Sequence, residues 1–116
     1  LTHQYWRIVS LRGQPVTSVP GQREAHLVLH GRTGQYRGVS ACASLTGSYQ
    51  VEGDRIVFAP PTTAATRACV SPAADSDASL REILVAVRRW AINAQILELF
   101  DEHERSIALF EAIHLR

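Results

Sequence analysis

Methionine and lysine are both absent from this 116-residue chain. Long apolar runs are absent too. None approaches the roughly 20 residues of a membrane-spanning helix, so we expect no membrane span. The missing methionine indicates a mature form or an excised piece of a longer protein, and no cleavable signal sequence is recognisable. The 46% hydrophobic and 20% charged residues exclude a disordered tail and fit one globular domain over residues 1–116.

Charge of one sign is not in excess, because 12 arginines stand against 11 acidic residues and the net charge is +1. Arginines and acidic residues alternate along the chain, and we expect the adjacent pair Arg88-Arg89 in a solvated turn. Nucleic-acid-binding domains of this size usually cluster a basic excess. The charge pattern therefore argues against a nucleic-acid partner.

Turn residues divide most of the chain into short segments rich in β-branched and aromatic residues. This spacing is typical of an antiparallel meander or barrel. Pro60-Pro61 should stop strand pairing, because proline has no amide hydrogen to donate. We predict a mainly β (α+β) fold, a small, strongly curved antiparallel sheet or partial barrel of about seven to eight strands. The predicted strands lie at residues 5–9, 25–30, 35–40, 47–51, 55–59, 90–92, 95–100 and 105–110.

One segment has the periodicity of a helix. Its apolar residues recur at positions i, i+3, i+4 and i+7: Leu80, Ile83, Leu84 and Val87. Such spacing forms one apolar stripe on a helix. Ser79 stands three residues before Glu82, the spacing of a capping box, and residues 75–77 offer further capping oxygens. We predict one helix over about residues 76–88 that covers the sheet or plugs one end of the barrel.

The two cysteines, Cys42 and Cys69, lie in loop-like segments. They would be buried thiols in a reducing cytosol and a disulfide in an oxidising compartment. The even count in a small domain favours the disulfide, which would contribute roughly 3–4 kcal/mol in the chain-entropy model. The missing C-x-x-C spacing argues against zinc. No base follows Cys42, which argues against a catalytic thiol.

Five histidines raise the question of a metal site. His26 and His30 have the spacing of a helical zinc motif. On a strand, however, they would stand roughly 13 Å apart on one face, too far for one ion with bonds near about 2 Å. The alternation assigns Leu27 and Leu29 to the core and the two histidines to the exposed face. We therefore expect no metal and no cofactor.

Groups suited to acid–base catalysis lie where water reaches them. Asp101, Glu102 and Glu104 cluster in a predicted turn, and Glu98 should face outward from its strand. The chain contains no G-x-S-x-G elbow, no phosphate-binding loop and no H-E-x-x-H motif. We expect no enzymatic activity and assign no catalytic residue.

Four aromatic residues allow two interpretations: Trp6, Tyr49, Phe58 and Trp90. In the first interpretation they fill the core, with each indole N–H hydrogen-bonded. In the second they line a pocket for an apolar molecule between the sheet and the helix. We prefer the filled core.

Motif residues recur in order over nearly the whole chain: Trp6, Gly38, Cys42, Gly47, Tyr49, Thr66, Cys69, Asp77, Leu80 and Leu84. This ordered set resembles the META domain family of HslJ-like bacterial proteins. That family usually shows Gly-Cys-Asn followed by Gly-x-Tyr, then Thr-x-x-Cys and an acidic–apolar–apolar helix pattern. This chain has Ala41 in place of the usual Gly and Ala43 in place of the usual Asn. A role of that Asn side chain is therefore not carried over.

The resemblance implies a small curved β domain with one helix, found in bacterial envelope proteins. Such domains are often lipid-anchored or attached to another envelope domain, and are linked to heat shock and stress tolerance. The matching cysteines support a Cys42–Cys69 disulfide and a periplasmic or outer-membrane-associated location. We expect a monomeric, non-enzymatic module for stress tolerance or for binding an envelope protein. The alternative is a carrier of a small apolar ligand.

Overall fold

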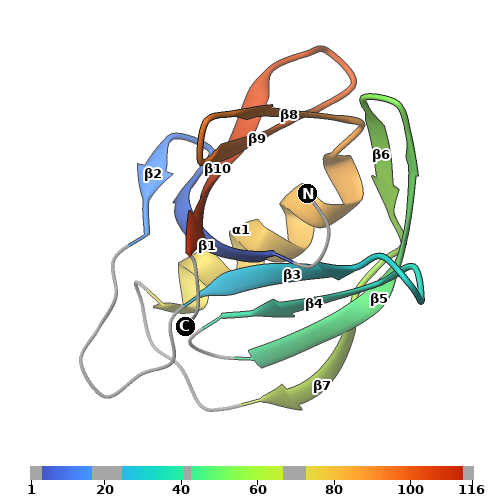
Figure 1. Cartoon of the computed structure of the whole chain (residues 1–116). Helices are drawn as coiled ribbons and strands as arrows, with labels where there is room; N and C mark the ends of the chain where they lie inside the picture. Colours follow the sequence, from blue (N-terminus) through green and yellow to red (C-terminus); the bar gives the residue numbers. More distant parts are fainter. Residues whose placement is uncertain (1–3, 17–24, 41–42, 67–72, 114–116) are drawn as a thin grey trace.

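The strands pair into one antiparallel sheet that curves around the helix α1 (Figure 1). The structure, a computed structural model, describes residues 4–16, 25–40, 43–66 and 73–113. The elements are β1 (Tyr5–Leu11), β2 (Gln14–Pro15), β3 (His26–His30), β4 (Gln35–Val39), β5 (Ala43–Glu52), β6 (Arg55–Phe58), β7 (Thr62–Thr66), α1 (Ala73–Ala86), β8 (Arg89–Asn93), β9 (Ile96–Phe100) and β10 (Ser106–Ile113).

The pairing of the strands returns to its start. The order is β10-β9-β8-β6-β5-β4-β3-β1-β2, and β10 also pairs with β1. β7 pairs with the first half of β5, and β6 pairs with its second half. The strand pairing is shortest between β6 and β8, which share one register pair, Arg55 with Arg89.

Further hydrogen bonds reinforce this short pairing between β6 and β8. The amide of Ile56 donates to the carbonyl of Arg88 at 3.1 Å, and the amide of Trp90 donates to the carbonyl of Asp54 at 2.9 Å. The indole Nε1 of Trp90 donates to the carbonyl of Gly53 at 3.1 Å. Trp90 thus ties β8 to the turn between β5 and β6.

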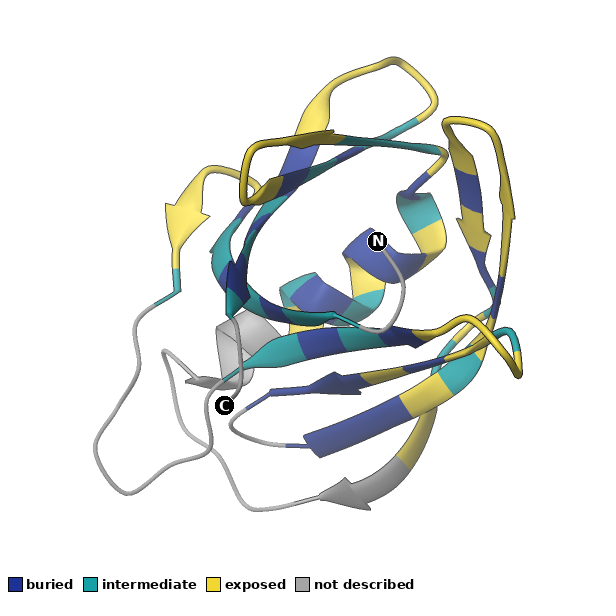
Figure 2. Ribbon diagram, viewed as in Figure 1, coloured by how far each residue is buried: buried dark blue, intermediate teal, exposed yellow. Residues whose placement is uncertain are grey.

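The core lies inside the ring. Inward and outward side chains alternate along the strands, which gives the banded burial pattern of Figure 2. In β3, Leu27 and Leu29 are fully buried, as their alternation predicts. The helix lies across the opening that the strands enclose (Figure 1). Its predicted apolar stripe is 0% exposed at all four positions: Leu80, Ile83, Leu84 and Val87.

The mainly β architecture is confirmed, and all eight predicted strands are present. Two further strands bring the total within the described residues to ten. β2 is only two residues long. β7 begins directly after Pro61, where we expected pairing to stop. The two prolines end β6 at Phe58, but Thr62–Thr66 carries β-branched threonines that favour a strand.

The helix starts and ends earlier than predicted. It spans Ala73–Ala86, so Ser79 lies inside it and the predicted capping box with Glu82 is wrong. The helix ends before Arg88 because the amide of Arg88 donates to the carbonyl of Phe100, at 2.9 Å. The chain has joined the sheet at that point.

Candidate functional site

The family-motif residues that the structure describes in full belong to the structural framework. Trp6 is 3% exposed, and Leu80 and Leu84 are 0% exposed. Gly38 pairs regularly within β4, with Leu27 of β3 and Leu45 of β5. A Cβ at Gly38 would meet Leu80 of the helix at 3.9 Å. The motif therefore places the sheet beneath the helix.

Gly47 makes room for an aromatic ring. It pairs with Tyr36 across β4 and β5, and a Cβ built at Gly47 would lie 2.7 Å from the Tyr36 ring. The Tyr36 hydroxyl donates to the carbonyl of Ala59 at 2.8 Å. Its ring meets Phe58 edge-on, with centroids 5.2 Å apart. Burial raises the pKa of Tyr36 to about 12.

A serine contacts the position where this chain departs from the family pattern. Ala43 replaces the usual Asn, and Ser40 stands three residues before it. The Ser40 hydroxyl oxygen accepts a hydrogen bond from the amide of Ala43 at 3.0 Å. The amide of Ser40 donates to the carbonyl of Ala43 at 2.9 Å. The ends of this β4–β5 connection are thus bonded without the amide side chain.

For four of the motif residues, the structure describes only the backbone or does not describe the residue. Cys42 and Cys69 lie outside the described residues, so their disulfide stays a prediction. Thr66 is the last residue of β7, and Asp77 lies within α1.

The four aromatic residues proposed to line a ligand pocket pack as parts of the structure. Trp6 and Phe58 are 3% exposed and Tyr49 is 9% exposed. The rings of Tyr49 and Phe58 have centroids 6.2 Å apart, and burial raises the pKa of Tyr49. Trp90 is half-buried, packs against the core and donates its indole N–H. This arrangement favours the filled core over a ligand pocket.

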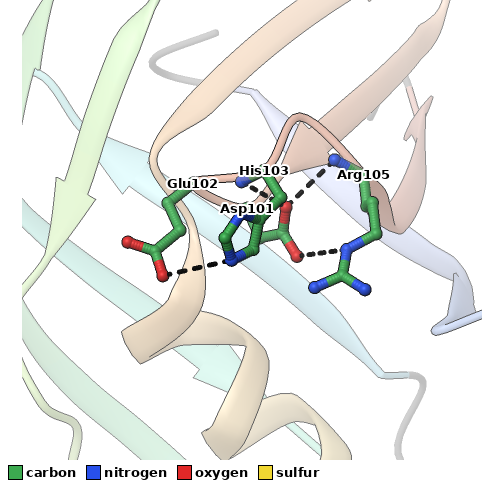
Figure 3. A network of polar contacts seen from close by, with 4 residues as sticks. All are labelled: Asp101, Glu102, His103 and Arg105. Atoms are coloured by element: carbon green, nitrogen blue, oxygen red, sulfur yellow. Dashed lines mark hydrogen bonds and ion pairs between the residues drawn. The ribbon is translucent and has the colours of Figure 1, made fainter.

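The acidic turn between β9 and β10 exposes Glu102 and Glu104, as predicted. The Asp101 side chain is only 12% exposed, contrary to expectation, because it organises the turn from within. Figure 3 shows Asp101 Oδ1 accepting hydrogen bonds from the amides of His103 at 2.9 Å and Arg105 at 3.0 Å. These bonds, that of Arg105 foremost, lower the pKa of the Asp101 carboxyl. Glu102, His103 and Glu104 are exposed. The carboxylate therefore has a structural role in the turn.

The outer face of β3 carries the two histidines that the sequence singled out. His30 is exposed, as predicted. His26 is not: it is half-buried, because its imidazole stacks on Tyr5 of β1 with centroids 4.3 Å apart and planes at 22°. The alternation of the sequence predicted correctly that His26 points to the outer face of the sheet. It could not predict that Tyr5 of β1 lies next to it there.

Arg37 of β4 lies beside these histidines on the outer face of the sheet. Arg37 of β4 is exposed and pairs in register with Val28 of β3, so it lies diagonally across from both His26 and His30. Within the described parts of the chain, Arg37 makes no ion pair. Arg7 on the same side of the sheet is neutralised by an ion pair with Glu111.

The predicted alternation of charges does not hold along these strands. Residues 25–51 contain two arginines, two histidines and no aspartate or glutamate. This run forms β3, β4 and most of β5. The composition of the whole chain conceals a local basic excess, which the charge pattern of this segment alone could have revealed.

These residues line an open depression on the outside of the sheet. Its volume is about 330 Å³, and it is lined by His26, Val28, His30, Arg37 and Val39. We call it the β3–β4 groove. Val39 is 2% exposed although it lies outside the main core cluster, and Val28 is half-buried. The groove thus combines an apolar floor with one guanidinium and two imidazoles.

Among the residues that the structure describes, no three histidine, cysteine or acidic side chains group to hold a metal ion. In the same residues, no helix is long and apolar enough to cross a membrane.

Sequence comparison identifies one family. The family model of the META domain matches residues 1–113. No curated protein matches the chain.

Solved structures share the fold at low sequence identity. One is an NMR structure of a protein from Burkholderia xenovorans, with a TM-score of 0.74 and 18% identity over 99% of this chain and 85% of the other. A second NMR structure has a TM-score of 0.70 and 17% identity, over 96% and 90% of the two chains. A DUF4847 family protein from Bacteroides vulgatus ATCC 8482 has a TM-score of 0.65 and 12% identity, over 97% and 94%.

Proposed function

The chain belongs to the META domain family, and we propose that it is a non-enzymatic module of the bacterial envelope that binds a partner protein, with a role in stress tolerance. One observation carries the proposal. The fully described motif side chains Trp6, Tyr49, Leu80 and Leu84 are buried in the core. Outside it, two histidines and Arg37, which has no ionic partner among the described residues, line an open groove. A domain with a filled core and polar side chains in an open surface groove is suited to binding.

The arrangement of polar groups supports a binding role over catalysis. A nucleophile needs an adjacent base that is itself oriented by a third group. His26 stacks on Tyr5, and His103 lies 3.5 Å from Glu102 in an exposed turn. Neither contact supplies a base poised beside a nucleophile.

The envelope location rests on the cysteine pair and on the family. Mass spectrometry of the protein isolated from the bacterium that encodes it tests this part. We expect the unreduced chain to be two hydrogens lighter than the reduced chain, which corresponds to a Cys42–Cys69 disulfide. We also expect the protein in the envelope fraction. Two free thiols in a chain from the cytoplasmic fraction would refute the location.

Site-specific photo-crosslinking in the same cells tests the binding role. A diazirine amino acid is placed singly at Val28 in the groove, Val57 on β6, Val85 on the helix and Ile96 on β9. The last three are 48%, 43% and 37% exposed, so each samples a different accessible surface. We expect one of the four positions to give a discrete crosslinked protein. That protein, purified, should bind the purified domain.

Two results would contradict the binding role. One is that none of the four positions gives a crosslink at native expression level. The other is that the crosslinked protein, once purified, does not bind. A small molecule that stays bound in native mass spectrometry would instead support the carrier alternative.

A further inference from the structure

We propose that the β3–β4 groove binds an extended acidic segment of a partner protein. A carboxylate side chain of that segment contacts Arg37, and an apolar side chain two residues away rests on Val28, the half-buried neighbour of Arg37 on β3. This inference rests on the proposed binding function and names the surface and the kind of partner.

The basic side chains of the groove favour an acidic ligand. Arg37 has no ionic partner within the described chain, whereas Arg7 is paired with Glu111. His26 and His30 flank Arg37 diagonally on the facing strand. β3, β4 and the turn between them, residues 26–39, contain no acidic residue. A planar guanidinium binds a carboxylate through two parallel hydrogen bonds, so an acidic group is the complementary ligand.

The spacing of the groove selects an extended chain. Arg37 and Val28 are register partners on β4 and β3, so their side chains stand side by side on the outer face with Cβ atoms roughly 5 Å apart. An extended peptide presents its alternate side chains on one face about 7 Å apart, and the long Arg37 side chain spans the difference. The acidic and the apolar side chain of one short segment therefore reach Arg37 and Val28 together.

The size and shape of the groove favour a protein segment over a free small molecule. Ligand pockets of about 300–1,000 Å³ usually bury most of the ligand, but this depression of about 330 Å³ is open on the outside of the sheet. It accommodates one or two side chains. The affinity must then come from a longer contact, which a partner protein provides.

Two matched peptides test the inference. The acetylated, amidated pentapeptide Gly-Glu-Ser-Val-Gly carries the acidic and apolar side chains two residues apart, and Gly-Gln-Ser-Val-Gly differs only in charge. Each is titrated into the ¹⁵N-labelled domain and followed by amide chemical shifts. We expect the acidic peptide to shift the amides of Val28, Arg37 and Val39. It should bind at least about tenfold more tightly than the neutral one, the scale of a charged hydrogen bond.

Two variants give the matched control. Arg37→Gln should bind the acidic peptide as weakly as the neutral one. Arg12→Gln removes an exposed arginine from the β1–β2 turn and should leave the affinity unchanged. The spectra of both variants also report whether the fold is intact.

Three outcomes would overturn the inference. The acidic peptide leaves the groove amides unmoved, the Arg12→Gln variant loses as much affinity as Arg37→Gln, or sodium acetate at the same concentration reproduces all of the shifts. The last outcome would reveal a site for small anions. If crosslinks form from Val57, Val85 or Ile96 while the peptides fail, the binding function stands and this surface assignment falls.

Discussion

The ring of Tyr36 occupies the space that a side chain at position 47 would need. Its Cε1 and hydroxyl oxygen lie 2.7 Å from the place of a Cβ on Gly47. The ring cannot easily retreat, because its hydroxyl is bonded to the carbonyl of Ala59 and its edge packs on Phe58. The Gly-x-Tyr motif thus requires glycine for a steric reason.

Gly47→Ala should therefore destabilise the domain by about 1–3 kcal/mol, the usual cost of overpacking. The measurement is the free energy of unfolding in urea. Gly38→Ala is the control, because a Cβ there meets its nearest neighbours at ordinary distances of 3.8–3.9 Å. That variant should be neutral or slightly stabilised. Equal destabilisation of both variants would show that Tyr36 does not set the requirement.

Tyr36 should make the domain less stable at alkaline pH. Its folded pKa of about 12 lies above the unfolded value near 10, so folding favours the neutral phenol. The resulting stabilisation is complete below about pH 10 and is lost as the pH rises towards the folded pKa. Between about pH 9 and 11, the wild-type domain should lose more unfolding free energy than Tyr36→Phe.

The same variant also loses the hydrogen bond to Ala59. At neutral pH, Tyr36→Phe should therefore cost about 0.5–1.5 kcal/mol. Spectrophotometric titration of the phenols provides the check, because Tyr36→Phe should remove the tyrosine that ionises near pH 12. Identical pH dependence of the two proteins would contradict this account.

Leu84→Ala should destabilise the domain by about 2–5 kcal/mol, because it leaves a cavity under the helix. Leu84 is 0% exposed. The adjacent Val85 is 43% exposed, so Val85→Ala should stay within about 0.5 kcal/mol of the wild type. Urea unfolding of both variants compares the two faces of one helix. A larger effect at Val85 would mean that the helix packs through another face.

Asp101 should contribute to stability through its charge. Its pKa is lowered by the amide of Arg105 first and then by that of His103. The stabilisation is thus present above the unfolded pKa of about 3.9 and is lost as the pH falls through the lower folded value. Asp101→Asn keeps an oxygen acceptor but removes the charge. We expect unfolding free energy to fall less steeply below about pH 4 in this variant.

Glu102→Gln is the matched control for that experiment. It removes a carboxylate from the same turn, where Glu102 contacts only the imidazole of His103 among the described residues. If Glu102→Gln flattened the acid dependence as much as Asp101→Asn, general charge in the turn would be responsible.

Much of the fold followed from local patterns. Leu27 and Leu29 lie inside because a strand alternates its faces, and the helix stripe at Leu80 and Leu84 is buried because apolar residues recur at helical spacing. Element ends were less predictable, since competing partners decide them. The helix ends before Arg88 because the amide of Arg88 bonds to Phe100, a residue distant in the sequence.

The candidate site was only partly visible beforehand. Alternation predicted that His26 and His30 share one outward face, whereas Arg37 lies in no recognisable motif and the sequence did not indicate its place beside them. Register brings it opposite Val28 and diagonal to both histidines. Such cross-strand neighbours depend on which strands pair, and that information is not local.

By itself, then, the sequence determined most of the strands, the helix, the inward faces and the family. These properties can be read from periodicity and motifs, each of which involves only a few neighbouring residues. The tertiary structure decided what those elements enclose and what they leave outside. The pairing of β1 with both β3 and β10 brings Tyr5 onto His26 and Glu111 onto Arg7. Arg37 lies over an apolar floor and has no ionic partner in the part of the chain that the structure describes, because strand register, a long-range property, fixes which charges meet.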